Sequence, residues 1–323
     1  MENMTGKRNN QVSLHQTRSG VRYRLKQIHD SEKFNGYLFI APLVLGVLIF
    51  SILPILFAFA MSFTDWNSLS APQIVGTLNY SKLLQDPNLG IELRNTLLYT
   101  IGTVPVTLIL AVLIANALNQ KIPCRGLFRT IYFLPVVTMQ VAVAMVWRWL
   151  LNSQFGVVNQ VLAWFGIEGP MWLGDSNFIM IAVIIVTVWN KLGYNTIILL
   201  AGLQGISDSY YEAADIEGIS AVKKFTKITL PLLSPSIFFV SITLTMDALK
   251  AFDIIYIFTG SGADSSSSPM LKAIRTMVYG IYENGFINMK MGYACAEAVI
   301  LFCIIMAITA LQFYMQKKWV YYD

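Results

Sequence analysis

Charged residues and histidines are scarce in this sequence of 323 residues. Only 13% of the residues are charged and 55% are hydrophobic, whereas a soluble globular chain carries roughly 25% charged residues. The composition therefore excludes an ordinary soluble domain. Only 2 histidines are present, His15 and His29, and both precede the first apolar run. Histidine chemistry is thus excluded from the apolar part of the chain.

Cysteines and nucleotide-binding patterns are equally sparse. The 3 cysteines (Cys124, Cys295 and Cys303) show no metal-ligand spacing, so we interpret them as packing residues and predict no metal site. The pattern Gly-x-x-x-x-Gly-Lys-Ser/Thr, which cradles phosphates, does not occur in the sequence. The chain is therefore not expected to bind or hydrolyse ATP itself.

Long apolar runs are what the sequence does contain. A helix needs about 20 apolar residues to cross the hydrocarbon core of a bilayer, and backbone groups in lipid must be paired internally. We therefore predict an all-α polytopic membrane protein with six transmembrane helices. The six runs are Tyr37 to Ser62, Asn95 to Leu118, Thr130 to Leu151, Phe178 to Leu203, Ile237 to Phe258 and Gly292 to Met315.

The basic residues predict the orientation of these spans. Residues 1–36 are polar and basic and lack the apolar core of a secretory leader, so we expect a cytoplasmic tail followed by a membrane domain over residues 37–323. With six spans, 15 Lys and Arg residues fall on the side of the termini and 5 on the other side. Both termini are therefore predicted to be cytoplasmic. We attribute the net charge of +5 to this topology and do not expect nucleic-acid binding.

The segment from Gln204 to Ser236 reads as a helical hairpin between the fourth and fifth spans. Ser209 and Glu212 fit a capping box at the start of a first short helix. Gly218 is placed to end that helix, because glycine adopts left-handed backbone angles without steric penalty. Ser220 could then cap a second helix, which Pro231 and Pro235 are expected to interrupt. Such a projection suits a docking surface for another protein or, equally, a linker on the membrane surface.

The same segment carries a resemblance to a known family. Its residues Glu212, Ala213, Ala214, Gly218, Ile228, Leu230 and Pro231 resemble, at full spacing, the EAA motif of bacterial ABC importer permeases. The resemblance implies that the segment forms coupling helices that seat in a cleft of a separate ATPase subunit. It also implies that Glu212 faces a basic residue of that ATPase, a role compatible with capping.

The resemblance extends from about Tyr37 to the C-terminus and is to carbohydrate permeases of the maltose and glycerol-phosphate type. It rests on four further segments: Phe128-Arg129-Thr130 with Phe133-Leu134-Pro135, Gly156 with Asn159, Trp189-Asn190-Lys191, and Ala251-Phe252-Asp253 with Thr259-Gly260. Two departures occur. Ser261-Gly262-Ala263 stands where many relatives have Gly-Gly-Pro, which weakens any inference about the loop after the fifth span, and Glu217 stands where relatives often have Asp.

The resemblance implies a type I ABC importer fold and a set of partners. These are a second homologous permease, two ATPase subunits or domains that use ATP and Mg, an extracellular solute-binding protein, and the lipid bilayer of a bacterial-type inner or plasma membrane. This chain itself is implied to bind no cofactor and to translocate a sugar or oligosaccharide, with glycerol phosphate as the alternative.

Charged and polar side chains within the spans are candidates for the substrate pathway. Each costs about 2.5 to 3.5 kcal/mol in hydrocarbon, so it needs a partner or water. On a continuous helix Lys250 lies midway between Asp247 and Asp253, where an ion pair could form. A buried structural pair and the wall of a wet cavity satisfy the physics equally. The candidates are Trp189, Asn190, Lys191, Asn195, Asp247, Lys250, Asp253 and Tyr256.

Two other function classes compete with the importer. An ion-coupled secondary transporter would use the intramembrane Asp and Lys residues as its ion pathway, although no inverted repeat is evident. A membrane-embedded enzyme is the weakest alternative, because the spans contain no nucleophile-base or metal-ligand constellation.

Overall fold

The computed structural model describes residues 32–120, 123, 125–259 and 268–321. Cys124, the polar tail up to residue 31 and the segment 260–267 therefore lie outside the described residues. The chain divides into two compact units, residues 1–60 and residues 61–323. Each unit is described by itself.

The first unit contains the predicted first span. Helix α2 (Glu32–Val47), a π-helical segment (Leu48–Ile52) and helix α3 (Leu53–Met61), which crosses the unit boundary, follow one another without a break. Residues Asn35–Met61 are long and apolar enough to cross a membrane.

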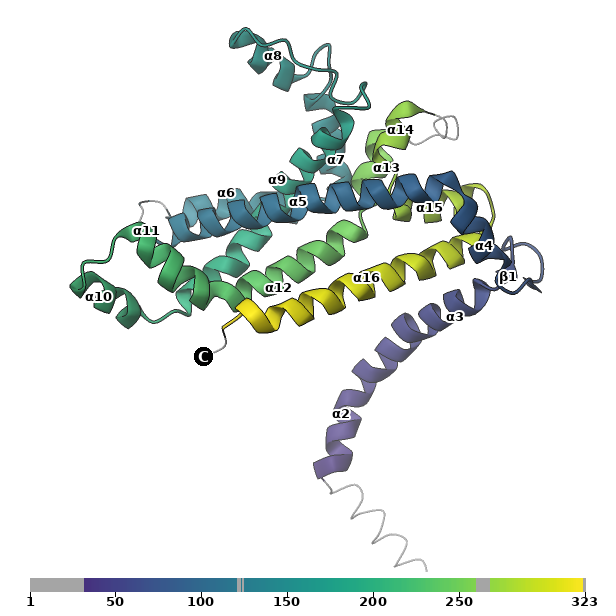
Figure 1. Cartoon of the computed structure of the whole chain (residues 1–323), viewed down its shortest axis with the longest axis horizontal. Coiled ribbons are helices and arrows are strands. Elements are labelled where there is room, and N and C mark those ends of the chain that lie inside the picture. The colour runs from purple at the N-terminus through teal and green to yellow at the C-terminus, as the bar shows by residue number, and fades with distance from the viewer. Residues whose placement is uncertain (1–31, 121–122, 124, 260–267, 322–323) are drawn as a thin grey trace, which may run out of the picture. The chain divides into compact units, whose positions relative to one another are not determined.

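The second unit is a helical bundle whose long members are α5 (Pro87–Asn119), α9 (Ile179–Gln204), α12 (Leu230–Leu249) and α16 (Met291–Trp319) (Figure 1). Helix α5 packs against α9 and α12, and α12 packs against α16. Small residues allow close approach, since a Cβ at Gly202 on α9 would overlap Oγ of Ser236 on α12. Apolar packing completes the core, where Ala111 and Ala115 of α5 join Leu199 of α9 in one buried cluster.

The predicted third span is confirmed as apolar, but it is not one straight helix. It consists of α6 (Arg125–Val137) and α7 (Gln140–Leu150), and the path is bent by 107° between Thr130–Val137 of α6 and α7. Pro135 has no N–H to donate, and the Thr138 hydroxyl donates to the Pro135 carbonyl at 2.6 Å. The described residues thus contain five single helices able to span a membrane, and a sixth span if this bent pair is counted.

Short elements connect the spans. Strands β1 (Thr64–Asp65) and β2 (Gln73–Ile74) pair antiparallel, with Thr64 opposite Ile74. Asp86 caps α5 by accepting from the amide of Asn88 at 2.9 Å. The other elements are α4 (Leu78–Gln85), α8 (Val157–Trp164), α10 (Asp208–Ile216), α11 (Ala221–Lys224), α13 (Asp253–Thr259), α14 (Pro269–Ile274), α15 (Met277–Tyr282) and two π-helical segments, Phe225–Thr229 and Glu283–Ile287.

Candidate functional site

The first leg of the hairpin between α9 and α12 is α10, and it begins earlier than predicted. Ser207, not Ser209, occupies the N-cap and accepts from the Ser209 amide at 3.4 Å. The Ser209 hydroxyl meets that of Ser207 at 2.8 Å. The predicted capping box of Ser209 and Glu212 is therefore wrong, because the serine two residues upstream takes the extended backbone that an N-cap requires.

The end of α10 is confirmed at Gly218. Its φ is +67°, in the left-handed region. The amide of Gly218 donates to the carbonyl of Asp215 at 3.1 Å, and the amide of Ile219 donates to the carbonyl of Ala214 at 2.9 Å. This pair of bonds is a Schellman motif, which satisfies the last carbonyls of a helix and requires left-handed backbone at the glycine.

The second leg differs from the prediction beyond its first turn. Ser220 stands at the N-cap of α11, although its side chain makes no capping bond. Helix α11, the π-helical segment Phe225–Thr229 and α12 then run on, so Pro231 and Pro235 do not interrupt the helix as predicted. Pro231 lies in the first turn of α12. The carbonyl of Pro231, which Pro235 leaves without its helical partner, accepts from the Ser234 hydroxyl at 2.6 Å.

Side-chain contacts hold the two legs together. Lys224 forms an ion pair with Asp215, and the hydroxyls of Tyr211 and Thr229 meet at 3.1 Å. Ala214 of α10 is buried.

The predicted coupling residues fall on both sides of this contact. Glu212, Ala213 and Gly218 are exposed, whereas Ile228, Leu230 and Pro231 are half-buried beside the bundle. Two apolar side chains on the hairpin also face outward, Ile216 at 88% exposure and Val222 at 73%. Exposed apolar side chains mark an interaction surface when they form a contiguous patch.

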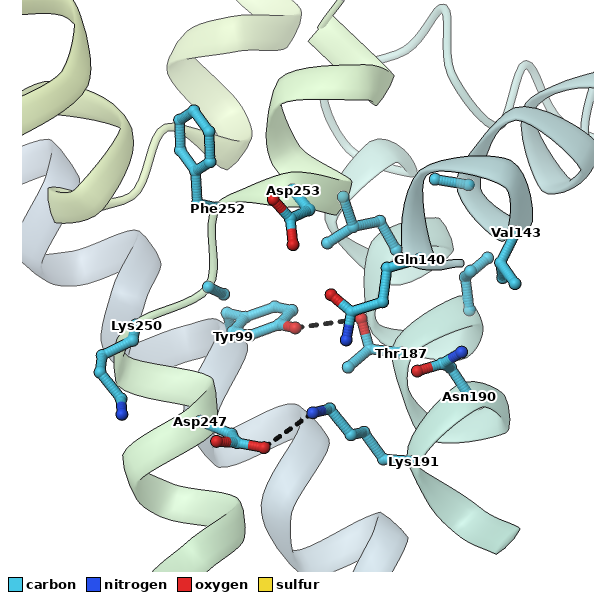
Figure 2. Close-up of a pocket in the computed structure, with 14 residues that line it drawn as sticks. Tyr99, Gln140, Val143, Thr187, Asn190, Lys191, Asp247, Lys250, Phe252 and Asp253 are labelled. Carbon is cyan, nitrogen blue, oxygen red and sulfur yellow. Dashed lines mark hydrogen bonds and ion pairs between the residues drawn. The ribbon is translucent and has the colours of Figure 1, made fainter. Parts of the chain in front are cut away.

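A polar cavity of about 310 Å³ lies between α5, α7, α9 and the end of α12 (Figure 2). Lys191 Nζ of α9 and Asp247 Oδ2 of α12 form an ion pair across it at 2.7 Å. The Tyr99 hydroxyl of α5 donates to Thr187 Oγ1 at 3.0 Å. Gln140, at the start of α7, also lines the cavity (Figure 2). The wall therefore presents hydroxyl, amide and charged groups together.

The structure brings five of the predicted pathway residues to this cavity: Asn190, Lys191, Asp247, Lys250 and Asp253. The predicted ion pair of Lys250 with either aspartate is not formed, because α12 ends at Leu249 and the helical spacing no longer holds. Among the described residues Lys250 has no ion-pair partner.

The other three candidates lie elsewhere. Asn195 is buried, donates to the Lys191 carbonyl at 2.7 Å and lines an adjoining cavity of about 260 Å³. Trp189 packs edge-on against Trp147 at a centroid distance of 5.4 Å and lines an apolar groove beside α6 and α7. Tyr256 stacks on Phe252, also at 5.4 Å, and does not reach the cavity wall.

Sequence reasoning missed Tyr99, Gln140 and Thr187. A signal for Tyr99 was present, since Asn95, Thr96, Tyr99, Thr100, Thr103 and Thr107 form a polar stripe at helical spacing along an otherwise apolar span. Gln140 carries no such signal, because only the bend between α6 and α7 places it here.

Comparison with known proteins identifies the family. Residues 95–321 match the family model described as binding-protein-dependent transport system inner membrane component. The chain belongs to this family. It is the membrane-embedded permease of an ABC importer, as the EAA resemblance indicated.

Individual relatives and a solved structure agree. The permease is 33% identical to the sn-glycerol-3-phosphate transport system permease protein UgpA of Agrobacterium fabrum, over 90% of this chain and 97% of that protein. It is 34% identical to the lactose transport system permease protein LacF of Rhizobium radiobacter, over 92% and 98%. The fold matches a chain of a bacterial alginate ABC transporter solved with its pentasaccharide-bound periplasmic protein, with a TM-score of 0.78, 22% identity and coverage of 91% and 96%.

Proposed function

We propose that this permease translocates a neutral sugar or oligosaccharide through the polar cavity beside Lys191 and Asp247. The relative named as a lactose transport permease supports a carbohydrate, and the cavity supplies suitable chemistry. Its volume of about 310 Å³ is at the lower end of small-molecule sites, roughly 300–1,000 Å³. Its hydroxyl and amide groups can exchange hydrogen bonds with sugar hydroxyls.

The charge balance of the cavity carries the choice of a neutral substrate. Its wall contains two cations, Lys191 and Lys250, and two carboxylates, Asp247 and Asp253. Lys191 is already neutralised by Asp247 at 2.7 Å. A site for an anionic solute would instead be expected to carry an excess of positive charge. Glycerol phosphate is the second candidate, and the observation in its favour is that Lys250 has no ion-pair partner among the described residues.

The energy source in this proposal is a separate ATPase that docks on the hairpin from α10 to α11. Glu212, Ala213, Ile216 and Val222 are all exposed on the hairpin, which leaves them available for a protein contact. Two ATPase subunits, using ATP and Mg, would then act on this chain and a homologous second permease. The hairpin and both termini are cytoplasmic in this arrangement, in accord with the distribution of basic residues. An extracellular binding protein delivers the solute on the opposite side.

Uptake by the purified complex in proteoliposomes tests the proposal. The complex is recovered with its ATPase and binding protein, and a panel of radiolabelled neutral saccharides is compared with radiolabelled sn-glycerol 3-phosphate. We expect accumulation of a neutral saccharide that stops when ATP is depleted and continues when ion gradients are collapsed. Uptake driven by an ion gradient without ATP, or selective uptake of the phosphate ester, would contradict the proposal.

A further inference from the structure

A second charged cluster lies at the end of the bundle away from the hairpin, where α5, α15 and α16 meet (Figure 1). Four of its side chains are almost fully buried. Glu92 of α5 is 2% exposed, Arg275 before α15 is 6%, Glu283 of the following π-helical segment is 7%, and Glu297 of α16 is 1%. A partner subunit or lipid can only bury these groups further, so their burial within this chain is a minimum.

Arg275 serves two of the three carboxylates. Its Nε donates to Glu92 Oε1 at 2.5 Å, and its Nη1 donates to Glu283 Oε2. Glu297 has no hydrogen bond to Arg275 in the structure. Its Oε2 accepts instead from the neutral amide of Asn284 at 3.0 Å. Oε1 of Glu297 is buried and has no hydrogen-bond partner in the structure.

The unpartnered oxygen of Glu297 lies close to Glu92. A Cβ placed on Gly280 of α15 would overlap both Oε1 of Glu92 and Oε1 of Glu297, so the two oxygens lie no more than about 5 Å apart beside the glycine. Two ionised carboxylates this close together in a buried site would repel each other strongly.

The surrounding charges offset that repulsion only in part, because the guanidinium of Arg275 is already shared by Glu92 and Glu283. Asp86 adds a further carboxylate to this end of the bundle and accepts from the Tyr293 hydroxyl at 2.9 Å. The ring of Tyr279, 5.9 Å from the Arg275 guanidinium, is neutral. Among the described residues, Arg275 is the cation paired with Glu92 and Glu283, and Glu297 has no cation partner. The described residues also contain no group of three or more acidic, histidine or cysteine side chains able to hold a metal ion.

We propose that Glu297 carries one proton on Oε1 and through it donates a hydrogen bond to Glu92 Oε1. The pair then carries a single negative charge, which Arg275 faces at 2.5 Å. The proton satisfies the one carboxylate oxygen that otherwise has no partner. It also joins α16 to α5 by a hydrogen bond between side chains that the sequence separates by two hundred residues. The site is independent of the identity of the transported solute.

The matched pair Glu297→Gln and Glu92→Gln tests the proposal in the purified transporter complex in lipid nanodiscs. Glutamine resembles a protonated glutamate in size and donor capacity, so the unfolding temperature of Glu297→Gln should lie within about 2 °C of the wild-type value. Glu92→Gln removes a buried partner of Arg275 and should lower the unfolding temperature by roughly 6 °C or more, or prevent assembly. Infrared spectra provide the second readout, since the wild type should show a C=O band of a buried protonated carboxyl that is absent from Glu297→Gln.

Three results would overturn the proposal. The first is that Glu297→Gln lowers the unfolding temperature or prevents assembly as strongly as Glu92→Gln, which would mean that the wild-type residue acts as an anion. The second is a protonated-carboxyl band that is missing from the wild type or unchanged in Glu297→Gln. The third is stabilisation of the wild type by NaCl relative to choline chloride that is lost in Glu297→Gln, which would assign the site to a cation.

Discussion

Gly218, at the turn of the hairpin, is the position where a single substitution tests the coupling role directly. Its φ is +67° and a Cβ there would meet nothing within 4 Å. A substitution is therefore opposed by backbone strain alone, with no steric overlap. The left-handed conformation costs an L-residue about 1–2 kcal/mol, and a β-branched side chain is the least tolerated there.

The expected effects form a graded series. Gly218→Asn should be mildest, Gly218→Ala intermediate and Gly218→Val strongest, because asparagine tolerates left-handed angles and valine does not. A cost of about 2 kcal/mol disfavours the native turn roughly 30-fold against its alternatives. We expect the valine variant to lose ATPase binding in co-purification, or to retain ATP hydrolysis while sugar uptake per ATP falls.

Gly166 after α8 is a matched control. Its φ is +73°, a Cβ there would also meet nothing within 4 Å, and the amides of Gly166 and Ile167 make the same two bonds to the preceding helix, both at 3.0 Å. Gly166→Val carries the same strain outside the hairpin and should leave ATPase binding intact. The reasoning is refuted if Gly218→Val transports like the wild type, or if Gly166→Val uncouples the transporter equally.

Three further predictions concern the interior. Asp247→Asn should change the free energy of unfolding by no more than about 1 kcal/mol, because the ion pair of Asp247 with Lys191 is partly exposed. Uptake measured in proteoliposomes should fall roughly tenfold, because the cavity wall loses one charge-assisted hydrogen bond. Tyr99→Phe removes a buried hydroxyl contact and should lower the unfolding temperature by about 2–4 °C in a thermal scan. Gly280→Ala forces a methyl group onto two carboxylate oxygens and should cost about 1–3 kcal/mol by the same scan.

The sequence predicted the spans because their signal is local. The runs from Asn95 to Leu118 and from Phe178 to Leu203 correspond to Pro87–Asn119 and Ile179–Gln204 in the structure. The observed helices are longer where polar residues extend them, since hydropathy marks the apolar part of a helix and not its ends. Gly218 was also predictable, because left-handed backbone selects for a residue type.

Contacts between distant segments were not predictable in this way. Neither Glu92 nor Glu297 was singled out from the sequence, since each lies near one end of a long helix and their meeting depends on how α5 and α16 pack. The same reason explains the partner of Asp247. Local spacing favoured Lys250, whereas the break after Leu249 and the packing of α9 on α12 select Lys191. The roles of the cavity residues in transport and of the hairpin residues in coupling remain predictions.

The uninterrupted path from Ala221 to Leu249 has a mechanical consequence. At 1.5 Å per residue, the rod that starts at the hairpin and reaches Asp247 is about 40 Å long. A tilt of about 5° at one end therefore moves the other by about 3.5 Å, more than the 2.7 Å that now separates Asp247 from Lys191. A small rotation of the helix at its hairpin end is therefore large enough to break or re-form the ion pair between Asp247 and Lys191.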